Sequence, residues 1–250
     1  MGFFDIFKGK STGKAGPSER PRAADKNVAR YSDAISKKAQ NFDRQEAIEN
    51  LSKLGTPEAA AALLRRYNFV TDPSITDQEE KETAFRGIVA AGKAALPAIR
   101  EFCARAESLT WPLRMMRELL DGDEYVTEVV KLLEKWDTEY ARNADPKIQL
   151  ISALEEVKDA RVRPAVERFL EDVQEPTRFH AVTTLLAQDD AESAGALARA
   201  LVKEEAMRTK NRIAEGLAMR GWVIPEIDRT DVDQKLPGAF RLGDDGKVVR

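Results

Sequence analysis

The chain has 250 residues, of which 42% are hydrophobic and 33% charged, and a formal net charge of −3. These values are ordinary for a helix-rich globular protein with a substantial core, and they exclude the disordered and fibrous classes. The single cysteine, Cys103, excludes an internal disulfide and suits a reducing compartment. No apolar run approaches the roughly 18 residues of a spanning helix, and the start lacks the order of a signal peptide, so we expect a cytoplasmic protein.

Residues 1–10 are predicted to form an amphipathic segment at the start of a basic arm. Lys and Arg outnumber Asp and Glu by seven to three in residues 1–30, whereas the remainder is acidic. Three roles stay open for the segment: peripheral attachment to the cytoplasmic face of a membrane, docking in a partner's groove, or folding back onto the chain's own body. Residues 11–24 are basic and rich in Gly, Pro and Ser, which predicts a flexible linker. The candidate recruitment residues are Phe3, Phe4, Ile6, Phe7, Lys8 and Lys10.

Helical periodicity begins at Asp25 and continues to about residue 225. Within residues 25–42, Val28, Tyr31, Ile35 and Phe42 fall on one side of a predicted helix. We expect this helix to cap the apolar end of the helices that follow.

Residues 145–204 contain one pattern twice: a helix with an apolar stripe, a polar break and a second such helix. A helix pair of this kind cannot bury its stripe alone, so neighbouring pairs must stack, which predicts an α-solenoid. The pattern recurs about six times, in steps of 31 to 37 residues, and an insert at residues 70–78 precedes the second copy. The first helices are expected to start at Asp43, Glu80, Pro112, Asp145, Glu175 and Met207, and their aligned apolar residues are Ile48, Phe85, Met116, Ile151, Val182 and Ile213.

Glycine and proline mark the expected helix boundaries. Glycines just past a first helix favour a left-handed C-cap, and prolines are tolerated in the first turn of a second helix because their missing N–H has no partner there. The glycines are Gly55, Gly92, Gly122 and Gly221, and the prolines are Pro57, Pro97 and Pro164.

Residues 43–225 resemble the HEAT repeats and their HEAT-like and armadillo relatives. The resemblance rests on an acidic residue or proline, then a basic residue, then an apolar pair: Asp43-Arg44 before Ala47-Ile48, Asp145-Pro146-Lys147 before Leu150-Ile151, and Glu175-Pro176 with Arg178 before Ala181-Val182. It implies a right-handed α-solenoid of about five to six helical hairpins. HEAT proteins are mostly scaffolds that hold other proteins in the groove of their second helices, and a few are enzymes, such as DNA glycosylases and phycobilin lyases.

Residues 226–250 lose the helical period and are expected to form a C-terminal cap or a free tail. Residues 239–242 and 247–249, joined across residues 243–246, predict a small β-hairpin. A two-stranded hairpin is marginal in isolation, so we expect Trp222 and Ile224 to pack it against the last helices.

The catalytic inventory of the sequence is thin. The only histidine, His180, and the only cysteine, Cys103, fall several repeats apart, and Cys103 is expected to be a small buried hydrophobe. A zinc site of the usual ligands is therefore not expected, and the acidic pairs fall at helix ends or breaks, where solvated carboxylates cap helices. We expect no catalytic, cofactor or metal site.

Basic and aromatic residues on the second helices are the candidate binding residues. Glu101, Glu167 and Glu171 are interleaved with them, so a mixed-charge groove is expected, which favours a protein partner over nucleic acid. Trp111 and Trp136 are interpreted either as core packing or as groove anchors. The sequence thus predicts a non-enzymatic scaffold or adaptor that is recruited by its N-terminal segment; the alternatives are a DNA glycosylase or a phycobilin-type lyase of HEAT-like fold. The candidate groove residues are Arg65, Arg66, Arg100, Arg105, Trp136, Arg163, Arg168 and Arg199.

Overall fold

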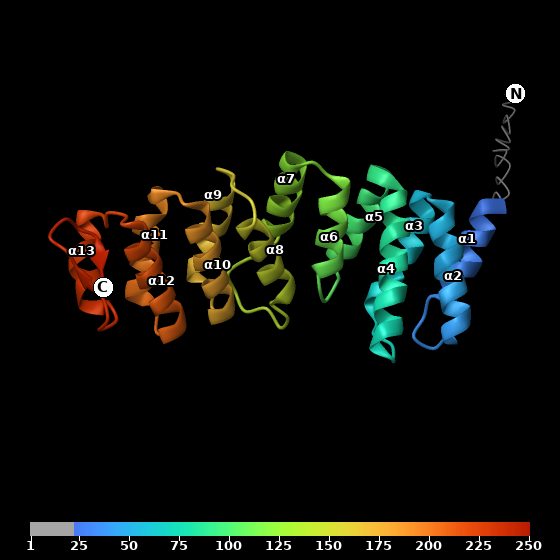
Figure 1. Cartoon of the computed structure of the whole chain (residues 1–250), viewed down its shortest axis with the longest axis horizontal. Coiled ribbons are helices and arrows are strands. Elements are labelled where there is room, and N and C mark those ends of the chain that lie inside the picture. The colour runs from blue at the N-terminus through green and yellow to red at the C-terminus, as the bar shows by residue number, and fades with distance from the viewer. Residues whose placement is uncertain (1–22) are drawn as a thin grey trace, which may run out of the picture.

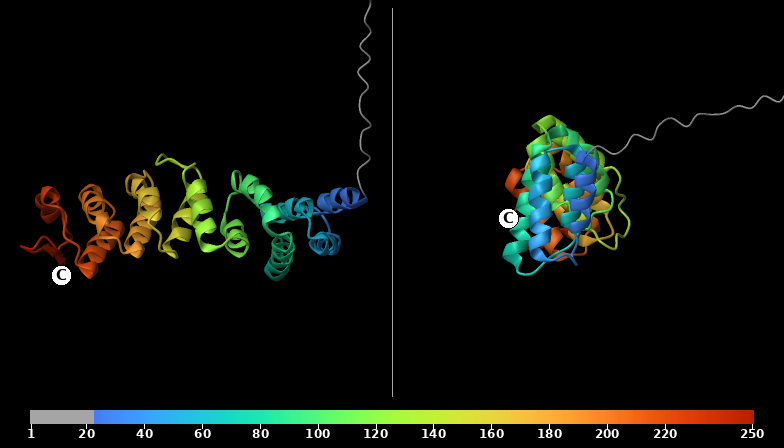
Figure 2. Two further views of the ribbon diagram at one scale, coloured as in Figure 1. Left: turned by 90° about the horizontal axis from the view of Figure 1, so that it is seen from above. Right: turned by 90° about the vertical axis from the view of Figure 1, so that its right-hand side faces the viewer.

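The computed structural model describes residues 23–250, which form an elongated, mostly α-helical molecule (Figure 1). Its helices follow one another in chain order from one end to the other. Seen along the long axis, they superpose within one narrow cross-section (Figure 2). Within the described residues no helix combines the length and the apolar character that crossing a membrane requires. The predicted segments 1–10 and 11–24 fall outside the described residues, except that α1 (Ala23–Ala34) begins at Ala23.

Two rows of helices alternate along the chain. Each helix of the first row contacts the next one of the same row. The first row consists of α2 (Asn41–Leu54), α4 (Ser74–Ala90), α6 (Thr110–Leu119), α8 (Asp145–Glu155), α10 (Glu175–Gln188) and α12 (Met207–Arg220). The second row consists of α3 (Pro57–Leu63) with the 3₁₀ segment η1 (Leu64–Asn68), η2 (Gly92–Ala95) with α5 (Leu96–Cys103), α7 (Gly122–Leu133), α9 (Val162–Val166) with η3 (Glu167–Glu171), and η4 (Ala191–Ser193) with α11 (Ala194–Lys203).

The aligned apolar residues of the first row belong to the core of the molecule, together with apolar residues of the second row. Ile48, Met116, Ile151, Val182 and Ile213 are fully buried, and Phe85 is 8% exposed. One position of each first-row helix therefore points into a continuous core, because i, i+3 and i+4 residues share a helix face.

Three of the four glycines predicted to end a first helix do so. Gly55, Gly92 and Gly221 adopt the left-handed conformation (φ 60°, 65° and 60°) just past first-row helices. Gly122 was wrongly predicted as a C-cap: it is the first residue of α7, and the Asp121 side chain caps that helix by accepting a hydrogen bond from the Glu124 N–H. In the fifth repeat, Asp189 takes the left-handed position (φ 59°) without a glycine.

Two expectations near the N-terminal end are wrong. The predicted helix over residues 25–42 ends at Ala34, and Phe42, in the first turn of α2, is 76% exposed instead of facing the core. The insert at residues 70–78 is shorter than predicted, because α4 begins at Ser74. The first turns of α4 contain Asp77, which is buried although it is charged, so a pattern of apolar residues does not predict that these turns pack inside the protein.

Buried ion pairs connect consecutive repeats. The Arg44 guanidinium of α2 donates to Glu80 of α4 at 2.9 Å, and Lys147 of α8 donates to Asp172, just before α10, at 2.5 Å. Both partners of each pair are almost inaccessible to solvent. These pairs hold neighbouring helices in register, because separating either pair would leave an uncompensated charge inside the protein.

Arg66 belongs to the same buried network. Its guanidinium is 0% exposed and donates to Glu80 at 2.6 Å and to Asp77 at 2.8 Å. Burial by itself raises the pKa of the Asp77 carboxyl, but hydrogen bonds from Lys81, Arg66 and the Thr71 N–H outweigh it and lower that pKa to about 2. Asp77 therefore stays ionised at neutral pH.

The C-terminal part forms a small cap on the last helices. Strands β1 (Arg241–Leu242) and β2 (Val248–Val249) pair antiparallel, as predicted, and Trp222 and Ile224 are buried beneath them. The cap also contains η5 (Glu226–Asp228) and α13 (Arg229–Lys235), which the sequence pattern does not predict; their only buried residue is Val232. A helix of two turns with a single apolar anchor gives almost no periodic signal.

Candidate functional site

A groove runs along the second row of helices between η3 and α11. Two adjoining cavities of about 370 Å³ and 350 Å³ form it, and they share Leu170, Glu171 and Ala200. We call it the second-row groove. Its other lining residues are Arg163, Pro164, Glu167, Arg168, Asp172, Arg178, Ala196, Arg199, Lys203, Glu204 and Glu205.

The helical spacing of α11 explains what it presents to the groove. Ala196, Arg199, Ala200 and Lys203 lie at i, i+3, i+4 and i+7, which is one face of a helix. The two alanines leave room beside Leu170, while the two cations extend into solvent with exposed side-chain fractions of 57% and 67%. A segment of another chain could therefore approach the backbone of α11 closely and meet charges on either side.

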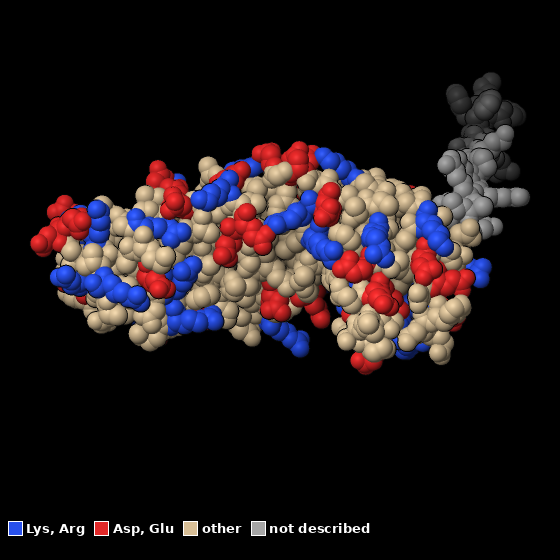
Figure 3. Space-filling view, viewed as in Figure 1, with Lys and Arg blue, Asp and Glu red and all other residues tan. Residues whose placement is uncertain are grey.

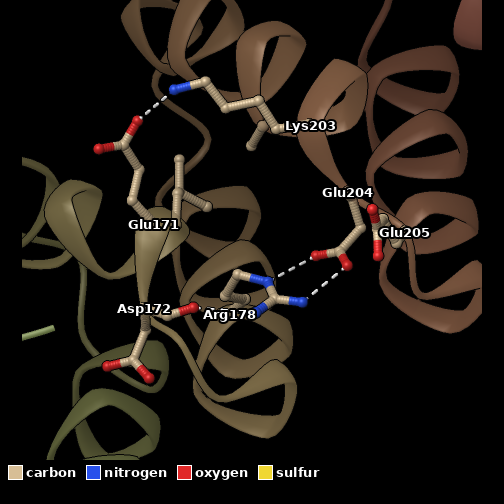
Figure 4. Close-up of a pocket in the computed structure, with 8 residues that line it drawn as sticks. Glu171, Asp172, Arg178, Lys203, Glu204 and Glu205 are labelled. Carbon is tan, nitrogen blue, oxygen red and sulfur yellow. Dashed lines mark hydrogen bonds and ion pairs between the residues drawn. The ribbon is translucent and has the colours of Figure 1, made fainter. Parts of the chain in front are cut away.

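Charges of both signs alternate around the groove. Lys203 donates to Glu171 at 2.6 Å across its mouth, and deeper inside Arg178 holds Glu204 by two hydrogen bonds of 2.8 Å (Figure 4). The bond from Lys203 lowers the pKa of Glu171. Burial raises the pKa of Glu204, but the bonds from Arg178 outweigh it and lower that pKa. Both carboxylates therefore remain charged at neutral pH.

The groove lining is electrically balanced. Five of its side chains are basic and five are acidic, by count of the residues named above. The visible face of the molecule likewise mixes both signs without a broad field of one sign (Figure 3). Phosphate backbones require a surplus of positive charge, so this groove offers nucleic acid little electrostatic attraction.

Three of the predicted groove residues, Arg163, Arg168 and Arg199, line the second-row groove together. Arg163 pairs with Asp190 of the next repeat at 2.7 Å, and Arg168 donates to the Trp136 carbonyl at 2.6 Å. Arg199 and Lys203 also pair within the chain, with Asp228 and Glu171, but their side chains are more exposed than that of Arg163 and are therefore more available to a ligand.

The remaining predicted groove residues are scattered. Arg66 is a correction, because its complete burial in the ion network removes it from any surface. Arg65 donates to Ser32 of α1 at 2.7 Å, and Arg100 binds Glu128 of α7 through two hydrogen bonds of 2.8 and 2.6 Å. Trp136 lines a separate cavity of about 210 Å³ beside Cys103.

Arg105 lines a third, larger cavity, which the sequence analysis did not predict. It has a volume of about 550 Å³ and four aromatic rings in its lining, and we call it the aromatic cleft. Trp111 lies at 5.3 Å from Tyr67, between ring centroids, so this tryptophan packs within an aromatic cluster. The aromatic rings come from η1, α5 and α6 and the loop after η1, so no single stretch of sequence signals the cluster. The lining residues are Tyr67, Asn68, Phe69, Val70, Lys81, Phe102, Arg105, Ala106, Glu107, Ser108, Thr110 and Trp111.

Within the part of the chain that the structure describes, Cys103 and His180 lie apart and line no common cavity. Cys103 is buried, as predicted, and its burial raises the pKa of the thiol to about 12. His180 Nδ1 lies 2.9 Å from the Ser152 hydroxyl, and burial lowers the pKa of the imidazole. Neither Ser152 nor His180 lines any of the cavities above. Among residues 23–250, no group of three or more His, Cys, Asp or Glu side chains is arranged to hold a metal ion.

Comparison with known proteins found no matching family model, no matching curated protein and no matching solved structure.

Proposed function

We propose that the chain is a HEAT-like, right-handed α-solenoid of about five to six helical hairpins that acts as a non-catalytic protein-binding scaffold. The repeat step of 31 to 37 residues supports the architecture, as do two rows of helices in chain order. The ion pairs support it further, because Arg44, Lys147 and Arg178 each lie in the first turn of a first-row helix and bind a carboxylate at or before the next one.

The second-row groove is the observation that carries the scaffold function. It is lined by small residues, one large apolar side chain and equal numbers of basic and acidic residues. Protein interfaces commonly place an aromatic or apolar anchor of one partner in such a site and surround it with charged residues. Each of its cavities is large enough for a few side chains. The occupant that fits is a short segment of a partner protein. Its charged side chains would replace the exposed ion pair Lys203–Glu171 by pairing with Lys203 and Glu171 themselves.

Charge reversal tests this function with a matched control. In cells that express the protein, we would compare affinity capture by Arg199→Glu/Lys203→Glu with capture by Lys93→Glu/Arg208→Glu. Lys93 matches Lys203 because it too is an exposed lysine that pairs with a glutamate of the neighbouring repeat, Glu124. The four cations replaced have side chains that are 57 to 67% exposed, and ion pairs at exposed positions are worth about 0 to 1 kcal/mol each, so both double variants should fold.

If the groove binds a protein, the unaltered chain should capture a protein that can be cross-linked to α11. The amount of that protein captured should fall at least about tenfold with Arg199→Glu/Lys203→Glu and stay unchanged with the control variant. A captured set that is identical for both variants and the unaltered chain would contradict it.

The N-terminal segment supplies recruitment in this proposal. Its six apolar and basic residues lie outside the described part of the chain, and their composition supports contact with an anionic membrane surface. Flotation of the full chain with anionic vesicles tests this: Phe3→Ser/Phe4→Ser/Phe7→Ser should abolish flotation, and raised salt should weaken it. Vesicle binding that survives the triple substitution would refute membrane recruitment by this segment.

A further inference from the structure

The aromatic cleft is the largest cavity described above and lies outside the second-row groove. Tyr67, Phe69 and Trp111 are each half-buried, and Val70 at its edge is 64% exposed. Aromatic and apolar side chains that remain open to solvent around a concave site favour an apolar occupant.

We propose that the occupant is the chain's own N-terminal segment, residues 3–10, bound in cis. The segment carries four large apolar side chains within five positions. Its charged residues are Asp5, Lys8 and Lys10, and those of the cleft lining are Lys81, Arg105 and Glu107. Each set holds two basic residues and one acidic residue, so the match rests on the apolar content of the segment and on the reach of the chain that connects it.

The connecting stretch is long enough for this contact. Arg65 of η1 binds Ser32 in the last turn of α1, so that end of α1 lies beside η1, and Tyr67 of η1 lines the cleft. The linker joins α1 at Ala23, the end of the helix away from Ser32, so it must first run back along α1, a length of 12 residues or about 18 Å. Residues 11–22 can extend to about 40 Å. About 20 Å of linker therefore remains to cover the distance from the end of α1 near Ser32 to the cleft.

Tethering makes a weak contact sufficient. A short covalent connection gives the segment an effective concentration in the millimolar range, so an affinity too weak for free peptides still fills the cleft most of the time. Docking withholds the same phenylalanines from a membrane or partner. Recruitment then requires release from the cleft, a consequence that rests on the proposed recruitment function, whereas the docking itself does not.

Photo-cross-linking of the full chain tests the docking directly. Phe4 is replaced by p-benzoylphenylalanine, the chain is irradiated without vesicles, and cross-linked peptides are mapped by mass spectrometry; Phe7 serves as a second position. Mixing isotopically light and heavy chains separates cross-links within one chain from those between two copies. We expect intrachain cross-links to residues 67–70 and 102–111.

Val70 provides the decisive variant and Ile75 its control. Both are exposed apolar residues, at 64% and 66%, but only Val70 lines the cleft. Val70→Lys removes apolar contact and repels Lys8 and Lys10, so it should lower the cross-link yield at least about fivefold, whereas Ile75→Lys should leave it unchanged.

Cross-links that are absent, lie elsewhere, join two copies or are insensitive to Val70→Lys would overturn the docking. Flotation with anionic vesicles then tests the regulatory step separately, and Val70→Lys should increase the bound fraction. Cleft cross-links combined with no vesicle binding by any variant would retain the docking and reject membrane recruitment.

Discussion

The buried pair Lys147–Asp172 gives the sharpest test of how the repeats are joined. Both side chains are 0% exposed, and the Lys147 ammonium also donates to the carbonyls of Asp137 and Glu139 at 3.3 Å, which ties the loop before α8 to that helix. Lys147→Met keeps the volume and removes the charge. Because Asp172 would then be buried without a counterion, we expect a loss of about 3 to 5 kcal/mol in the free energy of unfolding.

The double variant Lys147→Met/Asp172→Asn isolates the cause of that loss. An asparagine at position 172 is neutral and can still accept the hydrogen bond that Asp172 now receives from the Gln174 N–H at 2.9 Å. The double variant should therefore recover most of the lost stability. At about 2 to 4 °C per kcal/mol for a chain of this size, the difference is readily seen in thermal melts, and urea titration gives the free energies. A single variant within about 1 kcal/mol of the unaltered chain, or a double variant less stable than the single, would refute this reasoning.

Three further predictions address the core. The lowered pKa of Asp77 stabilises the fold above its unfolded pKa, and this contribution is lost as pH falls towards about 2; the stability difference between the unaltered chain and Asp77→Asn should therefore shrink by about 2 kcal/mol between pH 5 and pH 2 in urea titrations. Gly87→Ala would place its Cβ 2.7 Å from the Ser52 Cα and should cost about 1 to 3 kcal/mol by thermal melting, whereas Gly122→Ala meets nothing within 4 Å and should be nearly neutral. The Cys103 thiol should react with iodoacetamide at least about 100-fold more slowly in the native chain than in urea, and comparable rates would contradict its burial as a neutral thiol.

The apolar part of the fold could be predicted from the sequence because its signal is periodic. One aligned position in each of six helices is buried, and the starts of α8, α10 and α12 coincide with the predicted residues. The C-terminal hairpin was equally predictable, since two short β-prone stretches flank a Gly-Asp-Asp-Gly turn. In each case the local pattern and the final burial agree.

The part that could not be predicted involves charge inside the protein. The start of α4 was placed at Glu80, six residues late, because Asp77 and Glu80 look like solvent-facing residues until Arg66 and Arg44 are seen to neutralise them. For the same reason Arg66 was assigned to the groove. The pairing partners are 11 to 36 residues apart, so no local window contains the evidence.

The candidate sites likewise include one that the repeat pattern predicts and one that no local pattern predicts. Arg163, Arg168 and Arg199 lie on second-row helices of consecutive repeats, so repeat alignment alone brought them together. The aromatic cleft was not predicted because its four aromatic rings come from two helices, a 3₁₀ segment and the loop after η1, so no local stretch of sequence contains them together.

Basic residues of this chain therefore divide by position into two functional groups. Those in the first turn of first-row helices, such as Lys147 and Arg178, hold buried carboxylates and set the spacing between repeats. Those on the outer face of the second row, such as Arg199 and Lys203, keep exposed side chains, and ion pairs made by such side chains contribute little to stability. Changing the first group should alter unfolding, whereas changing the second should leave stability almost constant and, on the proposed scaffold function, weaken partner capture. Arg66 lies in the second row but behaves as a member of the first group, because the loop after η1 folds over it and brings Asp77 within hydrogen-bonding distance.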